Sequence, residues 1–300
     1  MLNRTKLLIA GILANFEETY RAMLQRPYLA QINALFTEIS SNKATETYAW
    51  LGEIPRVKEW LGAKVFSDLK SYAYTIVNKD WYAGFAVHKN EMEDEQIDAV
   101  TPRISMNAMV LADHKLELIA DLIKNGTTNL AFDGVAFFAS SGRAMGSNLL
   151  TGTGVTYAQL QTDISTARAA AMRFKDANTD DPKNLGIIMD TVVVPPELER
   201  VFMELVGSTS VIVDGKGSNV NPISSFIKNV IVLPELSDAN DWYMLCTTYP
   251  LKPFIYQNRK EVEPVVDETK LKSMGVYEFS AETRGDAGYG FPQLALKVTN

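Results

Sequence analysis

The sequence predicts an α+β fold, because one long amphipathic helix is flanked by segments that alternate as β-strands do. In residues 81–87, Trp81, Phe85 and Val87 share one face, and this period of two is typical of a half-buried strand. Residues 102–124 repeat apolar side chains at helical spacing instead. At 1.5 Å per residue, that helix would be about 35 Å long. Further segments with strand-like or helix-like spacing of apolar residues follow, up to residue 298.

The long helix is expected to start after a hairpin. Residues 72–88 should form that hairpin around the turn residues 78–80, and carboxylates over 91–98 suit the positive end of a helix dipole. Thr101 is the expected N-cap and Pro102 the first helical residue. The broad apolar face is predicted to be core, represented by Ile104, Leu111, Leu118 and Leu122.

The N-terminal residues 1–46 are predicted to be helical. Apolar residues recur from Leu8 to Leu24, and a second helical piece should run from Pro27 through Ile39. Within this segment alone, the apolar face has nothing to pack against. The segment therefore predicts an arm that lies outside the rest of the fold.

Residues 47–71 combine aromatic side chains with a nearly even set of charges. A long irregular segment of this composition is more typical of a contact surface than of a solvated loop. A loop that covers its own core remains the alternative. The residues predicted to contact another subunit are Trp50, Arg56, Lys58, Trp60, Lys64 and Phe66.

The second half of the chain alternates between the two kinds of element. Helices are expected over 157–174 and 197–206. A turn is expected over 283–290, where glycine recurs. Strands are predicted over 185–194, 226–233, 242–247, 254–257, 275–281 and 293–298.

The composition of the chain argues against several classes of function. A 300-residue chain with 46% hydrophobic residues can bury a sizeable core, while a net charge of -7 argues against tight nucleic-acid binding. The single cysteine, Cys246, excludes an internal disulfide and is expected to be buried. His88 and His114 lack zinc-ligand spacing and are expected to be exposed. No catalytic residue, cofactor, metal site or membrane span is predicted.

Several segments follow one another in a characteristic order. They include "YTIVNKDWYAGFAVHKNEMEDEQ", "PRISMNAMVLADHKLELIADLIKNG", "FDGVAFF", "NLGIIMDTVVVPPELERVFMEL" and "YEFSAETRGDAGYGFPQLALKV". In this order they resemble the major head subunit of Mu-like phages and prophages. The resemblance covers about residues 48–298. In residues 139–143 the chain departs from an acidic, His-Pro-containing turn that is common in that family.

This resemblance implies a tailed-phage capsid protein with the Hong Kong 97-like fold. Its expected parts are an N-terminal arm (1–46), an extended loop (47–80), a peripheral domain on the long spine helix (81–154 with 251–300) and an axial domain (155–250). The implied function is self-assembly, as pentamers and hexamers, into an icosahedral shell around double-stranded DNA.

The implied setting is a virion capsid that is built in the host cytoplasm. A separate scaffolding protein or protease and a portal are the expected partners, and no cofactor, enzymatic activity or membrane contact is expected. Two alternatives to the capsid function remain open. One is the shell protein of a cellular nanocompartment with the same fold, and the other is a carboxylate-dependent hydrolase.

Overall fold

The structure is a computed structural model that describes residues 2–48, 74–93, 97–176, 182–208, 210–212 and 218–300. Its mixture of helices and sheets confirms the predicted α+β class. In chain order, the described elements are α1 (Leu2–Leu24), α2 (Pro27–Asn33), β1 (Phe36–Ser40), β2 (Thr45–Tyr48), β3 (Tyr74–Val77), β4 (Lys79–His88), α3 (Lys89–Glu93), α4 (Ile97–Lys124), β5 (Leu149–Thr151), α5 (Tyr157–Met172), β6 (Thr191–Val194), α6 (Pro196–Gly207), β7 (Ser210–Ile212), β8 (Ser218–Val220), α7 (Ile223–Phe226), β9 (Asn229–Val232), β10 (Trp242–Leu245), β11 (Phe254–Asp267), α8 (Leu271–Met274), β12 (Val276–Tyr289), η1 (Pro292–Leu294) and β13 (Ala295–Thr299).

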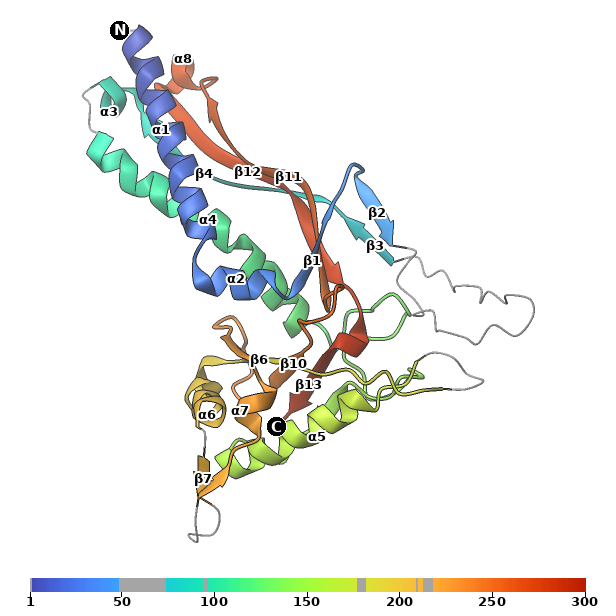
Figure 1. Ribbon diagram of the computed structural model, residues 1–300. Coiled ribbons are helices and arrows are strands. Elements are labelled where there is room, and N and C mark those ends of the chain that lie inside the picture. Colours follow the sequence, from blue (N-terminus) through green and yellow to red (C-terminus); the bar gives the residue numbers. More distant parts are fainter. Residues whose placement is uncertain (1, 49–73, 94–96, 177–181, 209, 213–217) are drawn as a thin grey trace.

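Two sheets organise the molecule (Figure 1). The four-stranded sheet has the order β1-β11-β12-β4, and α1 and α4 lie along it in the upper part of the view. The five-stranded sheet, β5-β13-β10-β6-β9, lies in the lower part with α5, α6 and α7. Strands β2 and β3 pair with each other to the side of the four-stranded sheet.

The long helix α4 connects two of the buried clusters. Its first half packs with Ile12 and Phe16 of α1 and with Phe279 of the four-stranded sheet. Its second half enters a cluster with Ile32 of α2 and Tyr243 of the five-stranded sheet. The helix therefore spans from one sheet to the other.

The four residues predicted as spine-helix core differ in depth. Ile104 and Leu111 are buried, whereas Leu118 and Leu122 are half-buried at the edge of the second cluster. The completely buried positions in the second half of α4 are instead Ile119, Ala120 and Ile123. The core-facing side of the helix changes between the two clusters, because different elements cover it there.

The start of α4 corrects the sequence-based expectation. The helix begins at Ile97, so Thr101 is not its N-cap and Pro102 lies inside it. A proline there removes one backbone donor near the helix start. Val100 is buried in the same cluster as Met92 and Ile104, and this packing accounts for the extra residues before the proline.

The predicted hairpin over residues 72–88 is wrong. Strands β3 and β4 are separated by Asn78 alone and do not pair with each other. Strand β3 pairs with β2, and β4 pairs along its whole length with β12. Asn78 donates from its amide to the hydroxyl of Ser41 (2.9 Å) and to the carbonyl of Lys43 (2.7 Å), which fixes the junction.

The predicted turn over residues 283–290 is also wrong, since β12 continues through it to Tyr289. A Cβ at Gly285 would lie 2.4 Å from the carbonyl oxygen of Gln257, and one at Gly288 would lie 2.5 Å from Ile76. The glycines therefore allow close approach of neighbouring elements rather than a reversal of the chain.

The arm differs from its prediction in two ways. Residues 36–40 form strand β1, parallel to β11, where a helix was expected. Helix α1 also buries Ile12 and Phe16 against its own chain, so the expectation that the arm lacks a partner within the chain is wrong. Helices α5 and α6 agree with their predicted ranges.

The proposed domain ranges remain predictions. Strands β5 and β13, which fall within the expected peripheral ranges, belong to the five-stranded sheet, where β13 pairs with β10 of the expected axial range. In the described part of the chain, no helix is both long and apolar enough to span a membrane.

Candidate functional site

The loop predicted to contact other subunits begins and ends at a fixed base. Tyr48 is paired with Tyr74 at the open end of the β2–β3 ladder. The Tyr48 hydroxyl donates to the side chain of Gln257 (2.7 Å), and the Tyr74 hydroxyl accepts from the backbone N–H of Tyr289 (2.9 Å). The predicted contact residues Trp50, Arg56, Lys58, Trp60, Lys64 and Phe66 lie outside the described residues.

One face of the four-stranded sheet is open in the described chain around β4 and the adjoining part of β12. Strand β4 alternates along its length, with Trp81, Phe85 and Val87 more buried than Tyr82 and its even-numbered neighbours. The buried face packs on α1 and α4, as the period of two predicted. The other face is open, and Tyr82 on it is 79% exposed.

A groove of about 780 Å³ runs across this open face. Its floor contains small residues, because Gly84 is paired with Ser280 across the β4–β12 ladder. A Cβ at Gly84 would lie only 2.8 Å from the carbonyl oxygen of Phe279, so the strands can approach this closely only with glycine there. We call this surface the sheet-face groove; its side walls carry Tyr82, Asp267, Glu278 and Glu282.

The charged side chains that line the sheet-face groove are all carboxylates, and lysines outside the lining lie near two of them. The Nζ atom of Lys270 lies 2.7 Å from Glu278, and the Nζ of Lys260 lies 4.0 Å from Glu282. A hydrogen bond from the Thr269 hydroxyl lowers the pKa of Asp267 below its ordinary value. The groove therefore combines exposed carboxylates with an aromatic side chain and a small-residue floor.

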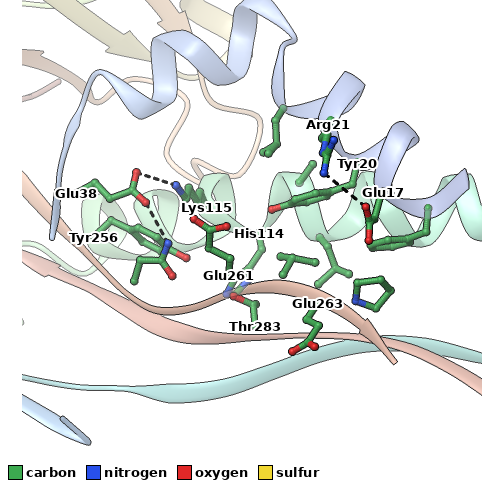
Figure 2. A pocket seen from close by; sticks show the side chains of 17 residues that line it. Glu17, Tyr20, Arg21, Glu38, His114, Lys115, Tyr256, Glu261, Glu263 and Thr283 are labelled. Carbon is green, nitrogen blue, oxygen red and sulfur yellow. Dashed lines mark hydrogen bonds and ion pairs between the residues drawn. The ribbon is translucent and has the colours of Figure 1, made fainter. Parts of the chain in front are cut away.

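A second hollow lies beneath the C-terminal half of α1 (Figure 2). It has a volume of about 420 Å³ and is bounded by α1, α4, β1, β11 and β12. We call it the arm cavity. The charged and aromatic side chains that line it are Phe16, Glu17, Tyr20, Arg21, Glu38, His114, Lys115, Tyr256, Glu261 and Glu263.

His114 is not the exposed residue that the sequence predicted. Its side chain is 12% exposed and its ring lies 4.5 Å from the Trp81 ring, centre to centre. The Nδ1 atom is 3.7 Å from Glu117, while Nε2 is buried without a hydrogen-bond partner. Burial lowers the pKa of His114 below its ordinary value, against the opposing charges of Glu117 and Asp286. His88 is exposed, as predicted.

Metal-binding groups and the cysteine were the side chains with possible chemistry in the described residues. Within them, no group of three or more His, Cys, Asp or Glu side chains is arranged to hold a metal ion. Cys246 is a free, buried thiol, as predicted, and its sulfur lies 3.6 Å from the Thr248 hydroxyl. Both hollows instead present carboxylates and aromatic rings suited to binding.

The fold places the chain in a known class of proteins. Over 98% of its length it is similar to the chain in the procapsid of bacteriophage JBD30, with a TM-score of 0.56, 21% identity and 75% of that chain covered. This likeness, together with two sheets spanned by a long helix, places the chain in the class of proteins with the Hong Kong 97-like fold.

The chain belongs to the family of the Mu-like prophage major head subunit gpT, whose family model matches residues 6–167 and 228–300. It is 25% identical to the Mu-like prophage FluMu major head subunit of Haemophilus influenzae, over 99% of this chain and 75% of that protein. It is 24% identical to the major capsid protein of Escherichia phage Mu, over 90% of this chain and 66% of that protein.

These matches confirm the resemblance read from the sequence, and they make the chain a phage head subunit that assembles with copies of itself into a shell. The sequence did not reveal either hollow. The alternation of Tyr82, Gly84 and Ala86 was visible and could have indicated an open, shallow sheet face. The arm cavity joins residues that are up to 267 positions apart, from Phe16 to Thr283, so no local pattern marks it.

Proposed function

We propose that the chain forms the wall of an icosahedral head, as pentamers and hexamers, around double-stranded DNA. Membership of the major head subunit family is the observation that carries this proposal. The acidic net charge of -7 supports it, because a container for packed DNA should not hold the DNA tightly. Assembly would take place in the host cytoplasm, with a separate scaffolding protein or protease and a portal as partners.

A non-enzymatic role is part of the proposal. The carboxylates that could have served a hydrolase line open, wide hollows, and the described residues hold no metal-binding group. Family membership also favours a phage head over a cellular compartment with the same fold. A shell subunit requires stable contact surfaces rather than a reacting centre.

The contact between subunits would join the loop 47–80 of one copy to the sheet-face groove of the next. The loop carries Trp60 with the basic residues Lys58 and Lys64. The groove offers carboxylates and a small-residue floor. Basic and aromatic side chains complement such a surface, since opposite charges guide association and an inserted aromatic ring anchors it.

Two measurements test the proposal. Electron microscopy and native mass determination of the purified protein should give closed particles of megadalton mass, whereas a stable monomer or dimer would contradict the shell function. Zero-length carbodiimide coupling of the particles, mapped by mass spectrometry, should join Lys58 or Lys64 to Asp267, Glu278 or Glu282 of another copy. Particles without such cross-links would reject this contact while leaving the shell function intact.

A further inference from the structure

The outward face of α4 carries a stripe of exposed apolar side chains. Met106, Met109 and Val110 are all exposed, and Met106 is the most open of them at 65%. Residues three and four positions apart are neighbours on a helix surface, so these three side chains share one face. That face lies opposite the buried residues Ile104 and Ala108. We call Met106, Met109 and Val110 the α4 stripe.

No other element of the described chain carries such a group. The remaining exposed large apolar side chains of the described residues lie singly, on α1, β3, β4, α5, α6 and α8 or in connecting segments. Single exposed apolar residues are normal on a protein surface, whereas a contiguous group points to a contact. In Figure 1 the first half of α4 lies at the left edge of the molecule, with α1 and the four-stranded sheet to its right.

Charges of opposite sign lie at the two ends of the α4 stripe. Arg103, one turn before it, is exposed and makes no ion pair within the described part of the chain. Asp113 and Glu117 follow on the same face, one and two turns after it. Asp113 pairs with Arg26, and the Glu117 side chain is largely exposed. This helix face is therefore basic at one end, apolar in the middle and acidic at the other end.

The order of charges along this face complements itself when the helix is reversed. If two copies of α4 pack antiparallel with Ala108 nearest the symmetry axis, Met106 of one copy faces Val110 of the other. Arg103 then faces Asp113, because the two residues lie equally far from Ala108 on either side. A parallel arrangement would instead bring like charges together. Since a two-fold contact uses the same surface on both copies, a self-complementary face favours a second copy of this chain as its occupant.

We propose that the α4 stripe is a two-fold contact between two copies of this chain. The stripe forms its apolar centre, and Arg103 of each copy pairs with Asp113 of the other. Flexible methionine side chains adapt to a facing surface, and the charge pairs at the ends set the antiparallel direction.

This contact differs from the one between the loop and the sheet-face groove. That contact joins two different surfaces and so continues from copy to copy around a ring, whereas a two-fold contact closes on itself. The inference rests on the proposed shell function and deepens it, because a two-fold contact would connect copies that belong to neighbouring rings.

Disulfide formation between copies tests both the contact and its direction. Two full-length variants, Met106→Cys and Val110→Cys, are mixed before assembly, oxidised mildly and analysed by mass spectrometry. We expect disulfides between position 106 of one copy and position 110 of another, in excess over 106–106 and 110–110 disulfides. The native Cys246 is buried and does not compete. Met203→Cys, at an exposed methionine on α6, is the matched control and should form few disulfides with Val110→Cys.

A charge placed in the stripe gives a second measurement. Met109→Glu, added to both cysteine variants, should lower the yield of the 106–110 disulfide by about tenfold or more, because a two-fold contact would bury the new charge twice. Met203→Glu in the same background should leave the yield unchanged. Met109 and Met203 are both exposed, so neither change removes a core side chain, and circular dichroism checks the folding of each variant.

The outcomes separate this inference from the proposed shell function. Particles that lack the 106–110 disulfide, or whose disulfide yield Met109→Glu does not lower, would overturn the two-fold contact and leave the shell intact. A soluble dimer that forms the disulfide would support the contact and contradict the shell, and a monomer without the disulfide would contradict both. A loss of particles with Met109→Glu, when the parent particles lack the disulfide, would assign the stripe to a different partner and also overturn the inference.

Discussion

Arg143 holds the carboxylate of Asp133 in a largely buried ion pair. The guanidinium donates from Nε and Nη2 to the two carboxylate oxygens, and from Nη1 to the carbonyl of Phe137 (2.8 Å). Asp133 in turn accepts from the backbone N–H of Val135 (3.1 Å). The pair thus closes the loop between α4 and β5.

Arg143→Ala should destabilise the chain by about 3 to 5 kcal/mol, because it leaves a partly buried carboxylate without its partner. The Arg143 side chain is 6% exposed and that of Asp133 is 18% exposed. Urea unfolding of the subunit measures the change. Arg200→Ala, at an exposed pair with Glu204, is the control and should cost under about 1 kcal/mol. Equal effects would mean that Arg143 does not hold the loop.

Replacing each of two glycines by alanine should change the stability of the chain in opposite directions. Gly285→Ala should destabilise by roughly 1 to 3 kcal/mol, since its Cβ would meet backbone 2.4 Å away. The Cβ that Gly11→Ala adds on α1 would have no atom within 4 Å, so this change should stabilise the folded chain by about 0.5 to 1 kcal/mol through helix propensity. Thermal unfolding of both variants checks the signs. A neutral Gly285→Ala would contradict the close approach of β11 and β12.

The second half of α4 should show a clear difference between neighbouring positions. Ile119 is completely buried, so Ile119→Ala should cost about 2 to 5 kcal/mol. Leu118 is half-buried at the edge of the cluster, so Leu118→Ala should cost roughly half as much. Chemical unfolding of the two variants under the same conditions measures the ratio. A larger loss at Leu118 would mean that the helix faces its partners differently.

The sequence located the elements whose packing follows their own periodicity. Helices α5 and α6 were predicted from repeating apolar residues and caps, and the inner face of β4 from its alternation. Strand β1 was missed because Phe36 and Ile39 are three residues apart, which also fits a helix. Local spacing could not reveal that β11 offers those residues a parallel partner.

Long-range pairing explains the other failures. The partner of β4 is β12, nearly 200 residues later, and a one-residue gap at Asn78 resembles a hairpin turn when that partner is unknown. Gly285 and Gly288 indicate a turn by composition but serve close packing. His114 was expected to be exposed because the residues around it on the helix are polar, yet Trp81 covers it from another strand.

His114 should make the folded chain sensitive to mild acid. Because burial lowers its folded pKa below the ordinary 6.5, the unfolded state binds more protons at low pH. Above pH 6.5 the neutral imidazole makes its full contribution to the free energy of unfolding. That contribution is lost as the pH falls from 6.5 toward the pKa of His114 in the folded chain. His114→Gln should remove this part of the pH dependence.

Urea unfolding at pH values from 5 to 8 checks this expectation. His88→Gln is the control, since His88 is exposed on β4, and it should keep the slope of the unchanged chain. A slope that is the same in all three proteins would show that carboxylates alone cause the acid sensitivity.

Trp60→Ala should leave the subunit folded and sharply reduce particle yield. A buried aromatic anchor at an interface contributes about 2 kcal/mol or more, whereas an exposed ion pair contributes about 0.2 to 1 kcal/mol. The same contact recurs around each ring of a closed shell, so a single weakened pair is repeated at every position. Arg56→Ala is the matched comparison and should lower the yield only moderately. The thermal transition of the unassembled subunit and particle counts by electron microscopy are the measurements. If Trp60→Ala unfolds the subunit while the remaining protein assembles normally, the loop covers its own core and the contact is elsewhere.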